Sequence, residues 1–340
     1  MTYARSERVS DMLRKVKWGV IGTAGIAEGC TIPGMQQAKN VSLYAIAGRS
    51  ISKAEQFKDK FGFKKAYGSY EELLSDKKIE AVYIPLPNNM HYEWVMKSIE
   101  AGKHVLCEKP LAPTARECEE LYAKAKEKGV LLMEAFAYLH SPYVEALKKD
   151  VESGIIGDVR YIEAAFLTSD YNKKNIRMNK DTFGGATYDL GCYCTSLILS
   201  IMGKEPEKIT AIAEMNSDGI DMLSTGILKY PNDVRATFRA GMVLETDMER
   251  RMDRVYIHGS KGCIKSDVEF NQEGRLSYKI YINGGAVKGE DHKFRAPQNY
   301  RLETEQFSRC IRGEEKPFVT EEFSIMNARV LDRILNEIGY

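Results

Sequence analysis

Short apolar runs alternate with amphipathic segments through the first part of the chain, and this alternation constrains the possible fold most. Between the apolar runs, Phe57 and Phe61 recur at helical spacing, and Thr114 with Glu117 forms a capping-box signature. Runs that are apolar throughout indicate strands covered on both faces, as in a parallel sheet between layers of helices. The predicted strands are Val16–Ile21, Val41–Gly48, Ala81–Leu86, His104–Cys107 and Val130–Met133. We therefore predict an α/β fold with a doubly wound parallel sheet that ends near Phe136.

A glycine-rich turn follows the first predicted strand. Gly22 and Ala27 occupy the first and third positions of the dinucleotide-binding pattern, whereas Ala24 stands where the second glycine is usual. Such a turn brings a helix N-terminus and its free N–H groups against a pyrophosphate. The pattern with one glycine missing is weak by itself, and its place between a strand and a helix strengthens it. The residues expected to contact a cofactor here are Gly22, Thr23, Ala24, Gly25 and Ile26.

Beyond Phe136 the pattern changes to strands with few helices between them. Many of these strands alternate polar and apolar residues, which is typical of antiparallel pairing with one exposed face. The predicted strands are Val159–Phe166, Ile209–Ala213, Leu223–Lys229, Arg235–Met242, Met252–His258 and Leu276–Ile282. The predicted helices are Gly184–Gly203, Glu303–Arg312 and Glu321–Ile338. We expect residues 1–136 to form a dinucleotide-binding domain that begins with an extension at 1–15. Residues 137–340 would form an α+β substrate-binding domain whose last helix packs back on the first.

Length and charge limit the possible functions. A chain of 340 residues exceeds what one core usually organises, which favours two domains. Its 49 Lys and Arg against 48 Asp and Glu leave a net charge of +1, so no global field favours nucleic acid or an acidic membrane. Residues 1–15 lack the apolar core of a signal peptide, and no window reaches the ~18 apolar residues of a membrane span. The seven cysteines include no CxxC pair, so we expect reduced thiols in a cytoplasmic protein.

A lysine stands at the end of the strand His104–Cys107, in the sequence Cys107-Glu108-Lys109-Pro110. The carboxyl ends of parallel strands are where α/β sheets hold ligands. We therefore expect Lys109 to face the site. A surface lysine that merely follows a strand is the alternative.

Tyr193 and Asp189 supply the other groups needed for chemistry at an alcohol carbon. Removing a hydride from such a carbon requires a base for the hydroxyl proton, and reduction requires the same group as an acid. A tyrosine with the usual pKa near ~10 is too weak a base at neutral pH, but a cation such as Lys109 would favour its ionised form. Asp189 lies four residues before Tyr193 on the same helical face and could orient the lysine or bind a second hydroxyl. In the alternative, Tyr193 is an ordinary buried aromatic and Asp189 a hydrogen-bonding helix residue.

The glycine turn, the lysine motif and the segment Gly184–Tyr193 together resemble the Gfo/Idh/MocA family of nicotinamide-dependent oxidoreductases, over nearly the whole chain after residue 15. Many members carry histidine at the position of Tyr193, and tyrosine there is similar to the branch of dihydrodiol, xylose and glucose–fructose oxidoreductases. The resemblance implies a Rossmann domain, an open sheet face used to form homodimers or homotetramers, and a cis Lys109–Pro110 peptide. It also places the loop after Ala81–Leu86 beside the nicotinamide. The cofactor contacts that it adds are Pro87, Asn88, His91, Glu108 and Lys109.

The histidines are less informative. His91 could equally be a structural residue at a helix start. His140 falls near the expected cleft, so it could bind substrate together with Lys109, Asp189 and Tyr193. No two histidines have metal-ligand spacing. We therefore expect no catalytic metal.

The end of the second strand indicates which nicotinamide cofactor is used. An acidic residue there would bind the ribose hydroxyls of NAD, and a basic residue would hold the 2′-phosphate of NADP. The sequence offers Arg49, Ser50 and Lys53, with no carboxylate before Glu55. An arginine can hold a phosphate with two parallel hydrogen bonds. NADP is therefore expected, with NAD also possible, unless Arg49 is only a solvated residue of a polar turn.

We expect an NADP(H)-dependent oxidoreductase that transfers hydride between nicotinamide and a sugar-like polyol, aldose or trans-dihydrodiol. One alternative is a redox-neutral glycosidase or lyase that uses the nicotinamide transiently. Another is a nicotinamide-sensing regulatory protein without catalysis. The presence of Lys109, Asp189 and Tyr193 counts against the regulatory protein.

Overall fold

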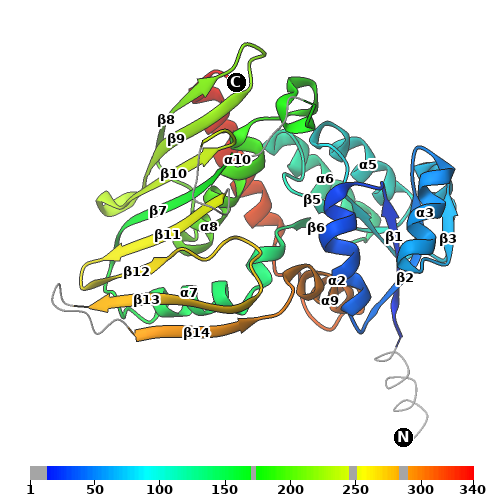
Figure 1. Ribbon diagram of the computed structural model, residues 1–340, viewed down its shortest axis with the longest axis horizontal. Coiled ribbons are helices and arrows are strands. Elements are labelled where there is room, and N and C mark those ends of the chain that lie inside the picture. Colours follow the sequence, from blue (N-terminus) through cyan, green and yellow to red (C-terminus); the bar gives the residue numbers. More distant parts are fainter. Residues whose placement is uncertain (1–13, 170–173, 245–250, 283–289) are drawn as a thin grey trace, which may run out of the picture.

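The structure is a computed structural model that describes residues 14–169, 174–244, 251–282 and 290–340. Two sheets, each with its own helices, lie beside one another in the molecule (Figure 1). The sheets define an N-terminal part, up to residue 136, and a C-terminal part. The extension expected at residues 1–15 lies, up to residue 13, outside the described residues.

The first sheet has six parallel strands in the order β3-β2-β1-β4-β5-β6, which confirms the predicted doubly wound fold. The strands are β1 (Val16–Ile21), β2 (Val41–Ala47), β3 (Lys65–Tyr67), β4 (Ala81–Ile84), β5 (His104–Glu108) and β6 (Leu132–Ala135). The strand order changes direction between β1 and β4: β2 and β3 are added on one side of β1, and β4, β5 and β6 on the other. Ligands of such sheets bind outside the carboxyl ends of the strands at this point.

The N-terminal helices bury their apolar sides against the sheet. They are η1 (Ala27–Thr31), α2 (Ile32–Gln37), α3 (Ile51–Phe61), α4 (Tyr70–Ser75), α5 (Asn88–Glu100) and α6 (Ala115–Lys128). Phe57 and Phe61 of α3 are buried, as their spacing predicts. At the start of α6, Thr114 and Glu117 form the predicted capping box, in which each side chain meets the backbone N–H of the other residue.

The second sheet is mostly antiparallel, as expected, and has the order β14-β13-β12-β11-β7-β10-β9-β8. Within the described part of this second sheet, β7 and β10 form the one parallel strand pair. The strands are β7 (Val159–Thr168), β8 (Lys208–Met215), β9 (Asp221–Lys229), β10 (Arg235–Gly241), β11 (Arg251–Gly259), β12 (Gly262–Ser266), β13 (Gly274–Ile282) and β14 (Glu290–Ala296). Alternate residues are exposed along β8 and β9, including Ile212 and Ile227, so one face of these strands is open.

The C-terminal helices pack on the other face and on the first sheet. They are η2 (Ala137–His140), α7 (Pro142–Glu152), η3 (Ile176–Met178), η4 (Lys180–Thr182), η5 (Thr187–Gly191), α8 (Cys192–Met202), η6 (Pro231–Asp233), α9 (Asn299–Ile311) and α10 (Glu321–Ile338). α8 contacts β7 and β10, and α9 contacts α2 (Figure 1). α10 contacts both β8 and α6, where Asp332 accepts a 2.9 Å hydrogen bond from the N–H of Ala115.

Three strands and several element boundaries differ from the sequence prediction; α9, for example, begins at Asn299 rather than Glu303, and β6 spans Leu132–Ala135 rather than Val130–Met133. β3, β12 and β14 are short or strongly polar, so no apolar run marks them. The helix expected from Gly184 begins only at Thr187, because Gly185 has φ +108°. That conformation is outside the helical region and is open to glycine at little cost.

Candidate active site

A cavity of about 860 Å³ lies between the two parts of the chain, at the carboxyl ends of β1, β4 and β5. From the N-terminal part it is lined by Gly22, Thr23, Ala24, Gly25, Ile26, Cys30, Arg49, Ser50, Lys53, Pro87, Asn88, Glu108 and Lys109, among others. From the C-terminal part it is lined by Phe166, Arg177, Phe183, Asp189, Tyr193, Arg251, Phe270 and Tyr300, among others. The cavity thus lies at the switch point where the fold predicts a ligand.

The glycine-rich turn forms one end of the cavity. Gly22 has φ +118°, and a Cβ there would come within 2.9 Å of the Leu86 side chain, so this position requires glycine. The turn leads into a helical segment that begins at Gly25 and continues as η1, and the N–H groups ahead of its first bond, from the Glu28 N–H to the Ala24 oxygen at 3.0 Å, have no partner within the helix. Arg49, Ser50 and Lys53 add a cationic side to the cavity at the start of α3. These donors and charges suit a phosphate-bearing dinucleotide.

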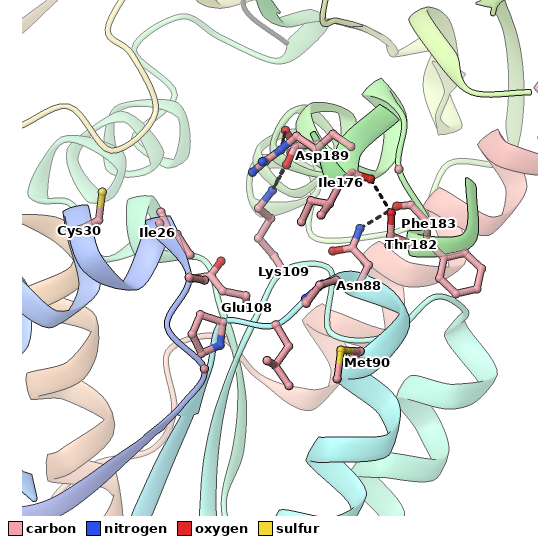
Figure 2. A pocket seen from close by; sticks show the side chains of 18 of the residues that line it. Ile26, Cys30, Asn88, Met90, Glu108, Lys109, Ile176, Thr182, Phe183 and Asp189 are labelled. Carbon is pink, nitrogen blue, oxygen red and sulfur yellow. Dashed lines mark hydrogen bonds and ion pairs between the residues drawn. The ribbon is translucent and has the colours of Figure 1, made fainter. Parts of the chain in front are cut away.

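Lys109 and Asp189 both line the cavity and form an ion pair with each other. Lys109 Nζ donates to the backbone oxygen of Asp189 at 2.7 Å and to its Oδ1 at 2.9 Å, and Arg177 Nε donates to Asp189 Oδ2 at 2.6 Å (Figure 2). The Lys109–Pro110 peptide is cis, as predicted. An ammonium group has three N–H donors, so these two bonds leave one for a substrate oxygen.

The charges of this cluster support one another. Burial alone would raise the pKa of Asp189, but Lys109 and Arg177 hold it well below its usual range. Burial alone would lower the pKa of Lys109, but the Asp189 carboxylate outweighs it and raises that pKa. Lys109 is therefore a permanent cation, and Asp189 a permanent anion, at neutral pH.

Tyr193 lies beside Lys109 in an aromatic setting. The Lys109 ammonium is 4.8 Å from the centre of the Tyr193 ring, and Phe270 and Phe166 lie 5.2 and 5.5 Å from it, ring centre to ring centre. Burial raises the pKa of Tyr193, and Lys109 offsets only part of that rise. The expected ionised tyrosine was therefore wrong for the free site, where the phenol is protonated and can act as an acid.

A π-helical turn presents Asp189 and Tyr193 on the same side. η5 runs directly into α8, so the two residues fall on either side of the join. Asp221 fixes the start of η5 by accepting 2.7 Å hydrogen bonds from both the N–H and the hydroxyl of Thr187. At Gly184 an added Cβ would lie 2.3 Å from the backbone oxygen of Arg177, so glycine allows the preceding segment to pack closely.

Asn88 links the two parts of the chain beside the cavity. Its side-chain nitrogen, at the start of α5, donates to the backbone oxygen of Phe183 at 2.8 Å (Figure 2). Glu108, the residue before Lys109, is held by a chain of two hydrogen bonds. The Tyr83 hydroxyl donates to Glu108 Oε1 at 2.6 Å, and the Thr31 hydroxyl donates to the Tyr83 oxygen at 2.8 Å. The bonds of Tyr83 and Thr31 hold Glu108 in place, and the bond of Asn88 holds the segment that contains Phe183 against the start of α5.

Two histidines named from the sequence do not line the cavity. His91 is fully buried, with Nδ1 2.7 Å from the Pro110 oxygen and Nε2 2.8 Å from the Leu86 oxygen. It supports the loops that carry Lys109 rather than contacting a ligand. His140 packs against the Phe318 ring, and its Nδ1 lies 3.4 Å from the Phe136 oxygen. Burial lowers the pKa of His140 to about 4, so it stays neutral away from the site.

Several cavity residues have no signal in the sequence. Arg177, Phe166, Arg251, Phe270 and Tyr300 come from separate elements, and only the packing of both parts brings them together. The glycines 184 and 185 could have drawn attention to the segment containing Arg177, since paired glycines indicate close backbone packing.

The described residues contain neither a cluster of metal-ligand side chains nor a membrane-spanning helix. Among them, no three His, Cys, Asp or Glu side chains are grouped as metal ligands would be. Within the same ranges, every helix is too short or too polar to cross a bilayer.

Comparison with known proteins assigns the two parts to one family. Residues 16–136 match the NAD-binding Rossmann fold of the Gfo/Idh/MocA oxidoreductase family, and residues 144–265 match the C-terminal domain of that family. The NADP-dependent D-xylose 1-dehydrogenase 2 of Haloferax volcanii is 34% identical, over 93% of this chain and 95% of the relative. The trans-1,2-dihydrobenzene-1,2-diol dehydrogenase of Mus musculus is 31% identical, over 95% and 97%.

A solved structure agrees with these relatives. The 3-ketoreductase KijD10 of Actinomadura kijaniata, crystallised with NADP and TDP-benzene, is 27% identical and superposes with a TM-score of 0.89 over 96% of this chain and 98% of that one. The chain is therefore a member of the Gfo/Idh/MocA family of NAD(P)-binding oxidoreductases.

Proposed function

We propose that this protein is an NADP(H)-dependent oxidoreductase acting on a sugar-like polyol, aldose or trans-dihydrodiol. The observation that carries the proposal is the contact of Lys109 with both Asp189 and Tyr193 at the mouth of a dinucleotide cavity. Relatives that are D-xylose and dihydrobenzenediol dehydrogenases give the substrate class. Within the proposal, residues 137–340 bind substrate and form the surface for homodimers or homotetramers in the cytoplasm.

In the proposed mechanism, the Gly22 turn together with Arg49, Ser50 and Lys53 would hold a nicotinamide dinucleotide, which would supply the hydride chemistry. Tyr193 would give its proton to the developing alkoxide during reduction, which leaves it as a phenolate beside Lys109; oxidation would run the reverse step, in which that phenolate takes the hydroxyl proton. Lys109 holds the substrate oxygen with its remaining N–H and stabilises negative charge on that oxygen. Asp189 keeps Lys109 charged and turned toward the cavity, while Arg177 holds the second oxygen of Asp189.

We infer NADP rather than NAD from the charges around α3. Arg49, Ser50 and Lys53 all line the cavity, and Arg49 is exposed enough to turn toward a ligand. A 2′-phosphate carries about two negative charges, which such a cluster would neutralise. The xylose dehydrogenase relative uses NADP, and the KijD10 ketoreductase was crystallised with it.

A substrate panel tests the proposal. Purified protein would be mixed with D-xylose, trans-1,2-dihydrobenzene-1,2-diol and other sugars and polyols, with NADP⁺ and with NAD⁺, while nicotinamide absorbance is followed. We expect net reduction of NADP⁺ by at least one ring compound and its loss in Tyr193→Phe. A tightly held cofactor that turns substrate over with no net absorbance change would instead favour redox-neutral chemistry.

A further inference from the structure

Three aromatic rings form one wall of the substrate end of the cavity. Phe270 lies 5.2 Å from Tyr193 and is stacked on Phe166 at 5.5 Å with an interplanar angle of 22°. All three side chains line the cavity. Phe270 is 6% exposed and also packs edge-on with Tyr138, at 4.9 Å between ring centres, so only a small part of the residue faces the cavity.

Phe270 has no support from regular secondary structure. It lies in the connection between β12 and β13, which ladder pairing leaves unpaired over residues 267–273. The next residue, Asn271, has φ +64°, a left-handed conformation that non-glycine residues seldom adopt. Within the turn, the Gln272 N–H donates to the Glu269 oxygen at 3.1 Å and the Glu269 N–H to Gln272 Oε1 at 3.0 Å, which leaves both main-chain groups of Phe270 to partners outside it.

Two residues of β11 hold both main-chain groups of Phe270. The Phe270 N–H donates to Asp253 Oδ2, and the Phe270 oxygen accepts a 2.9 Å bond from Arg251. Arg251 and Asp253 are themselves joined by two bonds of 2.8 and 2.6 Å. The guanidinium also lies 4.3 Å from the centre of the Phe166 ring. The pair therefore contacts two of the three rings.

An ion pair of this kind is poorly explained by stability alone. Asp253 is 3% exposed, and burying such a pair costs desolvation energy that the Coulomb attraction repays only when the geometry is good. Within the part of the chain that the structure describes, the bonds of Arg251 and Asp253 beyond the pair itself go to the main chain of Phe270 and the guanidinium lies over Phe166, with a more distant contact between Arg251 and Glu269 at 3.6 Å. The Arg251–Asp253 pair therefore contacts two residues that line the cavity, Phe270 and Phe166.

We propose that Arg251 and Asp253 are positioning residues, which fix Phe270 so that its ring packs against the ring of the substrate. The proposal rests on the function proposed above and deepens it, because it names the feature that separates cyclic from open-chain substrates. A rigid substrate ring can pack against an aromatic side chain with little loss of its own conformational entropy. An open-chain substrate must lose rotational freedom to make the same contact area, which weakens its binding.

The test compares two alcohols that differ in ring closure. trans-Cyclohexane-1,2-diol and hexane-3,4-diol carry the same vicinal secondary hydroxyls. We expect wild type to prefer the ring compound in kcat/KM, and Phe270→Ala and Arg251→Lys to reduce that preference by at least about fivefold, chiefly through KM. Lysine keeps the charge opposite Asp253 but cannot span the carboxylate and the Phe270 oxygen as the planar guanidinium does. Phe270→Tyr should keep the preference.

Controls separate positioning from folding. Arg254→Met changes another β11 arginine, which pairs with Glu163 and Asp267 and does not line the cavity, and should leave the preference unchanged. Thermal unfolding identifies any variant that fails to fold, and Phe270→Ala then decides the outcome. An equal loss of activity on both diols would overturn the proposal, because a merely structural pair would act on both.

A binding readout distinguishes this inference from the proposed function. Saturation-transfer NMR would follow trans-cyclohexane-1,2-diol with wild type and Phe270→Ala in the presence of NADPH. Transfer to the ring protons that weakens in Phe270→Ala supports the inference even if no turnover occurs, which would contradict only the proposed function. No transfer with wild type, or equal transfer with both proteins, overturns the inference.

Discussion

Lys109 and Asp189 are 80 residues apart in sequence, and their side chains form a 2.9 Å ion pair. This pair joins the end of β5 in the first sheet to η5 in the C-terminal part of the chain. Each side chain is nearly buried, with 9% and 11% of its surface exposed. The charge of each residue depends on the other, so the two parts of the chain form one electrostatic unit.

Removing the lysine charge should abolish most turnover. Lys109→Met is expected to lower kcat by at least about 100-fold, the scale of electrostatic and acid–base assistance. Asp189 would keep Arg177 as a counter-ion, so the fold should survive. Steady-state kinetics gives kcat, and calorimetric titration shows whether NADP still binds. Normal turnover would show that Lys109 does not act on the substrate.

Replacing the aspartate should make activity sensitive to alkaline pH. In Asp189→Asn the attraction that raises the pKa of Lys109 is lost, while burial and the nearby Arg177 both lower it. Lys109 should then lose its proton at a lower pH, and kcat/KM should fall on the alkaline side where wild type stays flat. The check is a pH–rate profile of both proteins. Parallel profiles would mean that Asp189 does not set the charge of Lys109.

Cofactor preference should follow the charge at position 49. Arg49→Asp is expected to change the NADP/NAD ratio of kcat/KM by more than about tenfold, or ~1.4 kcal/mol, in favour of NAD. The carboxylate would repel a 2′-phosphate and accept bonds from ribose hydroxyls. Arg116→Asp, at a side chain of α6 that is 87% exposed, serves as a control for the change in net charge. An unchanged ratio would show that Arg49 does not bind the 2′-phosphate, and Lys53 would then be the candidate for that contact.

A buried carboxyl that does not line the cavity, Glu134, should make stability depend on pH. Burial raises the pKa of Glu134 from 4.5 to about 7, against smaller opposing effects of Ser324 and the Leu111 N–H. Because the folded pKa is the higher one, ionisation costs stability that grows from pH 4.5 to 7 and then stays near ~3 kcal/mol. The uncharged Glu134→Gln keeps an acceptor for Leu111. Urea unfolding should show it more stable than wild type at about pH 8 and equal near about pH 4.5.

The sequence predicted the elements that obey a local rule. The apolar strands, the capping box at Thr114 and the glycine turn at Gly22 depend on residues close together in the chain, so their patterns are readable. Lys109 was identifiable for the same reason, since it follows a strand. The contacts of Arg177 and Phe270 were not, because they depend on packing between distant segments. The error at His140 had this cause too: its neighbours place it beside a strand end, but its ring turns toward Phe318.

The cavity lining divides cleanly between the two parts of the chain. The turn at Gly22 and the cationic start of α3 belong to the first part, while Phe166 and Phe270 belong to the second. Substitutions that alter nucleotide choice therefore need not disturb the surface that receives the substrate, and the reverse also holds. A protein built this way can acquire a new substrate while retaining its nucleotide, provided that the contact between Lys109 and Asp189 is kept.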